Sequence, residues 1–187
     1  MTSQRTTLLL AAVALVVLPG AAPPHGLPPC VHSPFRDITP TSIEGVVVGE
    51  PDAKDWGCVG ERGGPALLPL TASPVSSADT VGVPGNPPLV RVCFGPAFPN
   101  PADASTQVRF ALPSASRVSL VVYGQTWQHG PHDVFPVRTL ADGMFPAGLH
   151  AVTWDLNNDS GSRVARGVYR AVLVVGDDAL CGDIEIR

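Results

Sequence analysis

The fold is decided by residues 106–123, which read TQVRFALPSASRVSLVVY. Every second residue on each side of a short turn is hydrophobic: Val108, Phe110 and Leu112 before it, and Val118, Leu120 and Val122 after it. Because successive side chains of a strand point to opposite faces, this alternation is typical of strands that bury one face. Pro113 and the serines around it favour a turn between the two runs. Residues 106–112 and 117–123 are therefore predicted to be consecutive β-strands.

Shorter runs of the same kind extend along the chain. Further strands are expected at residues 43–48, 89–94, 137–140, 150–155, 167–175 and 183–187. The 21 prolines and 19 glycines favour frequent turns, and no stretch carries a helical hydrophobic stripe. The polar run from Asp155 to Gly161 is expected to form the hairpin turn between two of the strongest strands. The sequence thus predicts an all-β fold, with an antiparallel β-sandwich at the C-terminus.

Three segments of different composition divide the chain. Residues 1–22 carry one charge, Arg5, followed by an apolar run and then small residues, which is the order of a secretory signal peptide. The apolar run, Leu8 to Leu18, is shorter than the roughly 20 residues of a membrane-spanning helix. Residues 23–95 form a Pro/Gly-rich segment with a few short strands, and residues 96–187 hold the sandwich. We therefore expect an exported protein (periplasmic, cell-surface or extracellular) with no membrane span after signal removal.

Four cysteines, Cys30, Cys58, Cys93 and Cys181, are expected to form two disulfides, because an even number behind an export signal is typical of oxidised proteins. No CxxC spacing occurs, so zinc and redox chemistry are disfavoured. Three pairings are open. We favour Cys93–Cys181 with Cys30–Cys58, because each end of the sandwich segment carries one cysteine. A lipid-anchored Cys30 is the alternative, although no lipobox directly follows the apolar run.

Charge and motifs exclude several classes of function. The net charge is −4, from 12 basic and 16 acidic residues, and the scattered basic residues leave no electrostatic footprint for nucleic acid. No GxSxG, HExxH, P-loop or dinucleotide-binding motif is present. The sequence therefore favours a protein that is not an enzyme, needs no cofactor, and has a protein or envelope component as its partner.

An ordered set of motifs resembles a known family. Its members here are Pro99, Asn100 and Pro101, the stretches 108–113, 118–123, 137–140 and 146–150, then Trp154 and Asp155, and finally Gly161, Gly167 and Tyr169. In this order residues 96–187 resemble the Ig-like domain of flagellar hook-capping proteins of the FlgD type. They are also similar to the C-terminal sorting domains of type IX secretion.

The resemblance implies an Ig-like β-sandwich with a structural, binding or envelope-assembly role. Within it, Trp154 and Tyr169 are expected to be large aromatics of the core on neighbouring strands. Gly161 and Gly167 are expected at turns that need positive φ or a close approach, and Pro99 and Pro101 in an extended entry strand. The alternative function is a removable secretion address on a short passenger.

Three groups of polar residues could carry chemistry, and each has a simpler explanation. Asp155, Asn157 and Asp159 alternate as calcium ligands do, but a turn capped by its own side chains is the favoured interpretation. In loop 124–136, His129, His132 and Asp133 could support a metal-dependent hydrolase, yet an exposed loop with Trp127 as a contact residue is favoured. Finally, four carboxylates near the C-terminus are expected on a solvated hairpin rather than as an acid/base pair: Asp177, Asp178, Asp183 and Glu185.

Overall fold

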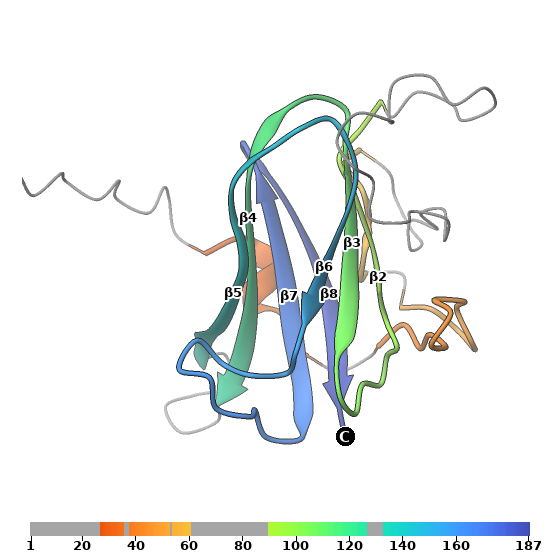
Figure 1. The fold of residues 1–187 in the computed structure, drawn as a ribbon, viewed down its shortest axis with the longest axis vertical. Helices are drawn as coiled ribbons and strands as arrows, with labels where there is room; N and C mark the ends of the chain where they lie inside the picture. Colours follow the sequence, from red (N-terminus) through yellow and green to blue (C-terminus); the bar gives the residue numbers. More distant parts are fainter. Residues whose placement is uncertain (1–26, 36–37, 53, 61–89, 127–132) are drawn as a thin grey trace, which may run out of the picture.

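The computed structural model describes residues 27–35, 38–52, 54–60, 90–126 and 133–187, and it is an all-β antiparallel sandwich (Figure 1). One sheet has the strand order β1-β2-β3-β6 and the other the order β5-β4-β7-β8. A single 3-10 turn, η1 (Pro29–His32), precedes them in the described part of the chain. The strands are β1 (Gly57–Cys58), β2 (Cys93–Phe98), β3 (Thr106–Leu112), β4 (Ser116–Thr126), β5 (Asp133–Phe145), β6 (Gly148–Trp154), β7 (Gly167–Val175) and β8 (Asp178–Ile186).

The core lies between the two sheets and is built from the alternating residues that the sequence singled out. All six alternating side chains of β3 and β4 are fully buried: Val108, Phe110, Leu112, Val118, Leu120 and Val122. Phe94, Leu173 and Ile184 complete the core from β2, β7 and β8. Burying one face of each strand in this way is what holds two sheets together. The prediction of an antiparallel β-sandwich is confirmed.

Two short predicted strands are parts of longer ones. Residues 137–140 belong to β5, which pairs with β4 along almost its whole length, and residues 183–186 belong to β8, which pairs with β7. A strand lengthens wherever a partner satisfies its backbone groups, and the hydrophobic pattern alone does not reveal that partner. Likewise the strand expected from residue 89 begins at Cys93, and Leu89 itself is outside the described residues.

The strand predicted at residues 43–48 is wrong. Only an isolated bridge joins Thr41 to Val47, and the Ser42 hydroxyl accepts the backbone N–H groups of Glu44 and Val46. Such local side-chain bonds compete with strand pairing. As a result the segment forms a turn in which Ile43 is 74% exposed.

The hairpin predicted around Asp155 to Gly161 is also wrong, because β6 and β7 lie in opposite sheets. The connection between them crosses from one sheet to the other. Trp154 at the end of β6 is fully buried and meets the ring of Tyr169 on β7 edge-on, with centroids 5.5 Å apart. The two aromatics therefore pack across the core and not on adjacent strands of one sheet.

The N-terminal described segments are joined to the sandwich and do not form a separate unit. The predicted boundary between residues 95 and 96 falls inside β2, which pairs with β1 on one side and β3 on the other. In Figure 1 η1 lies beside the later strands, and it contacts β5 and β8. This attachment is what builds the candidate site.

Candidate functional site

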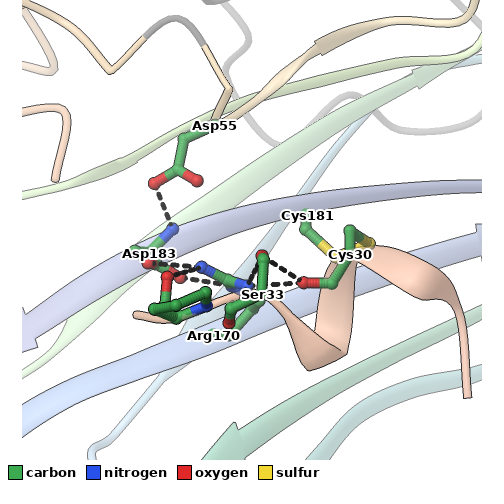
Figure 2. Close-up of a disulfide and its surroundings, with 7 residues drawn as sticks. Cys30, Ser33, Asp55, Arg170, Cys181 and Asp183 are labelled. Atoms are coloured by element: carbon green, nitrogen blue, oxygen red, sulfur yellow. Dashed lines mark hydrogen bonds and ion pairs between the residues drawn. A yellow bond between two sulfur atoms is a disulfide. The ribbon is translucent and has the colours of Figure 1, made fainter. Parts of the chain in front are cut away.

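Arg170 on β7 and Asp183 on β8 form a buried ion pair at the centre of the candidate site (Figure 2). The two residues are directly opposite in the strand register. Nε and Nη2 of Arg170 donate to the two carboxylate oxygens of Asp183, at 2.6 and 2.7 Å. Their side chains are 5% and 1% exposed. Bidentate geometry of this kind gives the strongest hydrogen bonds between side chains.

The remaining N–H groups of Arg170 bind the N-terminal arm, which we define as residues 27–35. Nη1 donates to the carbonyl of Cys30 and to the carbonyl and hydroxyl of Ser33, and Nη2 donates to the carbonyl of Pro34. The guanidinium carbon also lies 4.2 Å from the ring centre of Phe35. All five donors of the guanidinium are thus used. Arg170 acts as a clamp on the arm, and it has no free donor for an anionic ligand.

A second segment, residues 54–60, closes the gap between the two sheets. The backbone N–H of Trp56 donates to the carbonyl of Cys181 at 2.7 Å, and the Asp55 carboxyl accepts the backbone N–H of Asp183 at 2.8 Å. The two residues after Trp56 form β1, which pairs with β2 in the other sheet. One short segment therefore bonds to both sheets.

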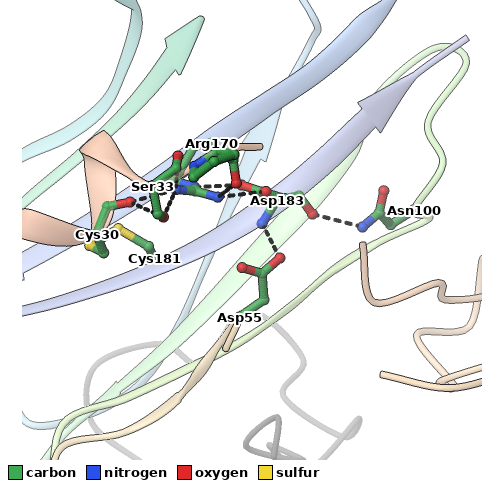
Figure 3. Close-up of polar contacts among 8 residues, drawn as sticks. Cys30, Ser33, Asp55, Asn100, Arg170, Cys181 and Asp183 are labelled. Carbon is green, nitrogen blue, oxygen red and sulfur yellow. Dashed lines mark hydrogen bonds and ion pairs between the residues drawn. A yellow bond between two sulfur atoms is a disulfide. The ribbon is translucent and has the colours of Figure 1, made fainter. Parts of the chain in front are cut away.

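Asn100 adds further hydrogen bonds along the same edge of β8 (Figure 3). Its side chain donates to the carbonyls of Asp183 and Thr39, at 2.9 and 3.1 Å, and accepts the N–H of Glu185 at 2.9 Å. Ala102 then exchanges backbone bonds with Glu185 and Arg187. Together these partners satisfy the outer edge of β8 from residue 181 to residue 187, which we call the sealed edge.

Burial makes Asp55 hard to ionise. Desolvation, with the nearby charge of Asp183 adding to it, raises the pKa of the Asp55 carboxyl to about 8. The backbone N–H of Asp183 and the charge of Arg170 oppose this shift but do not cancel it. At neutral pH the Asp55 carboxyl is therefore mostly protonated, and the positive charge of Arg170 is matched by the negative charge of Asp183.

A pocket of about 270 Å³ lies beside the clamp. It is lined by Cys30, Ser33, Pro34, Asp52, Lys54, Asp55, Arg170 and Cys181. The Ser33 hydroxyl donates to the Cys30 carbonyl and accepts from Arg170, so this hydroxyl is bonded on both sides by the protein itself.

The disulfides differ from the favoured pairing: they are Cys30–Cys181 and Cys58–Cys93, and the pairing Cys93–Cys181 with Cys30–Cys58 is wrong. The reason is strand register. Cys58 on β1 lies directly opposite Cys93 on β2, with their Cα atoms 4.0 Å apart. Cys181 is then left for Cys30 of the arm. Two disulfides indicate an oxidising environment, such as exported proteins meet.

The proline and glycine residues of the motif lie at the ends of strands or in the connections between them. Pro99 and Pro101 follow β2 instead of lying in an entry strand, and both come after cis peptide bonds. Gly161 lies in the loop after β6 and Gly167 is the first residue of β7. They adopt φ of +80° and +152°, which residues with a side chain rarely adopt. Asn100 between the prolines is fully buried.

The calcium-like residues face their own loop. Both carboxylate oxygens of Asp155 accept bonds from Asn157, and Asp159 accepts the backbone N–H of Thr139 on β5. Self-capping of this kind was the favoured prediction for this turn. Within the described ranges, no group of three His, Cys, Asp or Glu side chains is placed to hold a metal. Trp127, His129 and His132 are outside the described residues.

The prediction of a solvated carboxylate hairpin is right for Asp177 and Asp178 but wrong for Asp183. Asp183 is buried because its strand position faces Arg170 beneath the arm. A signal for this pair was present in the sequence. If Gly176 and Asp177 form a two-residue turn, counting outwards along both strands pairs Arg170 with Asp183.

Nothing in the sequence pointed to Ser33 or Asp55 as members of the site. Both reach it through contacts that span more than a hundred residues of chain.

No helix in the parts of the chain that the structure describes is long and apolar enough to cross a membrane. No family model matches the chain, and no curated protein matches it. Among solved structures it matches the alkylpurine DNA glycosylase AlkC of Pseudomonas fluorescens, bound to DNA containing an abasic site analog. That match has 14% identity and a TM-score of 0.30, and it covers 49% of this chain and 28% of the glycosylase. A TM-score at this level carries no argument about fold or activity.

Proposed function

We propose that this chain is an exported, non-enzymatic β-sandwich protein that keeps its N-terminal arm and serves a structural or binding role in the cell envelope. The resemblance of residues 96–187 to FlgD-type Ig-like domains supports that role. The chemistry of the clamp supports it too. Every N–H group of the Arg170 side chain donates a hydrogen bond to the protein itself. Among the described residues around it, the hydrogen bonds show no activated nucleophile.

One observation carries the choice between a retained module and a removable secretion address. The Cys30–Cys181 disulfide joins the N-terminal arm, which precedes residue 95, to β8, which follows it. A single cut near residue 95 would leave the two parts covalently linked. It would also fall within β2, which is hydrogen-bonded on both sides. These links favour a protein that acts with both parts together.

The test is the intact mass of the native protein from its own host, measured before and after reduction and alkylation. We expect one species running from about residue 23 to residue 187, with four thiols that become reactive only on reduction. Fractionation of the same cells should place that species in the envelope or the medium. A species ending near residue 95, or beginning there, would refute the proposal and support the secretion address.

A further inference from the structure

One short segment is attached to the two sheets by bonds of different kinds. Residues 54–56, which we call the latch, lead directly into β1, where the Cys58–Cys93 disulfide ties the chain to β2. The latch meets β8 through two hydrogen bonds, one donated by the Trp56 N–H and one accepted by the Asp55 carboxyl, and through the packing of the Trp56 ring. Separation from β8 therefore breaks no covalent bond, whereas separation from β2 would break one.

Three features make the closed position of the latch unfavourable. Trp56 adopts a φ of +59°, in the left-handed region that residues with large side chains rarely occupy. Its indole Nε1 is buried without a hydrogen-bond partner among the described residues, and an unsatisfied buried N–H group is destabilising. Asp55 is only 3% exposed, although a carboxyl group is normally solvated. Backbone strain of this kind concentrates in switch regions, and segments of low local stability are the first to open.

The groups that face Asp55 favour its protonated form while the latch is closed. Burial, followed by the charges of Asp183 on β8 and of Asp52 just before the latch, raises the pKa of Asp55 to about 8. The N–H of Asp183 and the charge of Arg170 on β7 lower the pKa, but Arg170 is already bonded to both carboxylate oxygens of Asp183. The pocket described above is lined by Asp55 and Lys54, so it gives the solvent a route to this carboxyl.

We propose that the latch is a pH-sensitive switch: when Asp55 loses its proton, residues 54–56 separate from β8, while the Cys58–Cys93 disulfide keeps them attached to β2. Below the ordinary carboxyl pKa of 3.8, Asp55 is protonated in both positions of the latch, so the closed position has its full stability. As pH rises, the open latch loses this proton first, because its carboxyl lies in water. The equilibrium constant for opening therefore rises by up to about tenfold per pH unit and levels off near pH 8, where the closed latch ionises as well.

Opening changes the sealed edge at its first residues. The carbonyl of Cys181 loses the Trp56 N–H, and the N–H of Asp183 loses the Asp55 carboxyl. The bonds of Asn100 to the same edge do not involve the latch, so the rest of the edge stays covered. The switch is thus confined to one end of the sealed edge.

The experiment is amide hydrogen exchange of the full mature chain from pH 5 to pH 8, with both disulfides intact and with rates corrected for intrinsic exchange. We expect the opening constants of the Trp56 and Asp183 amides to rise together by up to about tenfold per pH unit. The amide of Leu120, on a central strand, should open far less often, because it exchanges only through global unfolding. The natural sequence alone therefore tests the switch.

Two variants identify the group that titrates. D55N cannot ionise and keeps an acceptor for the Asp183 N–H, so its opening constants should not change with pH. D177N, in the exposed turn before β8, is the matched control and should keep the pH dependence of the natural protein. Opening constants of Trp56 and Asp183 that do not vary with pH would overturn the proposal. So would constants equal to that of Leu120, which would indicate unfolding of the whole molecule, or the same pH dependence in D55N.

Discussion

Asp55 is the residue whose ionisation the fold opposes most clearly. Its pKa lies at about 8 against an ordinary value of 3.8, because it is buried beside Asp183. The folded protein therefore holds a proton between these two values that the unfolded chain has lost. The stabilisation is complete below about pH 4 and is lost as pH rises toward 8. This direction is opposite to that of an ion-paired carboxylate.

The first prediction concerns this pH dependence. The free energy of unfolding should fall by up to about 1.4 kcal/mol per pH unit between pH 5 and 8. D55N cannot ionise, and its amide oxygen can still accept the Asp183 N–H, so the fall should be much shallower in this variant. Urea unfolding over a pH series measures both, with disulfides intact. An equal slope in D55N and the natural protein would show that another group is responsible.

Gly182 is a position at which the structure leaves no room for a side chain. A Cβ at this position would lie 2.2–2.4 Å from the Trp56 ring atoms, so the indole packs directly on the backbone of β8. The Trp56 ring also contacts Phe94, with centroids 4.9 Å apart. A larger residue must displace this ring from the core.

We therefore expect G182A to cost about 1–3 kcal/mol of stability and to change tryptophan fluorescence. Chemical unfolding measures the first effect and the emission spectrum the second. G143A is the matched control, since nothing lies within 4 Å of a Cβ on that β5 glycine. Equal stability in the two variants would mean that the Trp56 ring can move aside without a loss of folding free energy.

Among the elements, the sealed edge depends on one side chain. Asn100 satisfies backbone groups of two different segments from a fully buried position. N100A would leave two carbonyls and one N–H without this partner. Because unsatisfied buried groups are costly, we expect a loss of about 2–4 kcal/mol and faster exchange of the Glu185 amide.

N157A is the control for this prediction, since the side chain of Asn157 makes only an exposed bond to Asp155. It should change stability by less than about 0.5 kcal/mol. Urea midpoints and amide exchange of both variants decide the matter. Similar losses of stability in N100A and N157A would mean that the Asn100 bonds to the sealed edge contribute no more than a bond in a surface turn.

The sequence predicted the elements where the signal is local. The sequence located residues 106–112 and 167–175 correctly and residues 117–123 nearly so, because the burial of a strand is reflected in the pattern of its own residues. The prediction failed where the structure of a segment depends on which other strand it pairs with. Residues 43–48 alternate too little and bond locally, and the turn at 155–161 joins two sheets. No local pattern distinguishes a crossover from a hairpin.

The candidate site was less predictable than the fold for the same reason. Asn100 belongs to a sequence motif, but nothing in that motif indicates its partners on β8. A carboxylate alone in a sequence is usually solvated, so the sequence predicts a solvated Asp183. Its burial follows from Arg170 opposite it and from an arm that arrives from residue 30. Contacts of such long range follow from register and topology, which one sequence does not fix.

At the scale of the whole molecule, the two disulfides should contribute unequally. They close separations of 151 and 35 residues, for which the chain-entropy model gives about 5 and about 4 kcal/mol. C30S/C181S should therefore lose more stability than C58S/C93S. It should also expose the arm to limited proteolysis, although Arg170 still binds it. Thermal unfolding and a time course of digestion test this, and the reverse order would contradict it.

The Cys30–Cys181 bond also has a mechanical consequence. A pull applied at residue 27 and at residue 187 would pass from the arm through this bond into the last residues of β8. Residues 27–30 and 181–187 lie in the line of force, and β8 is held by its pairing with β7 and by the bonds of the sealed edge. The chain between residues 31 and 180 is outside this covalent path. The disulfide therefore limits how far the two ends can be pulled apart before β8 itself must separate from β7.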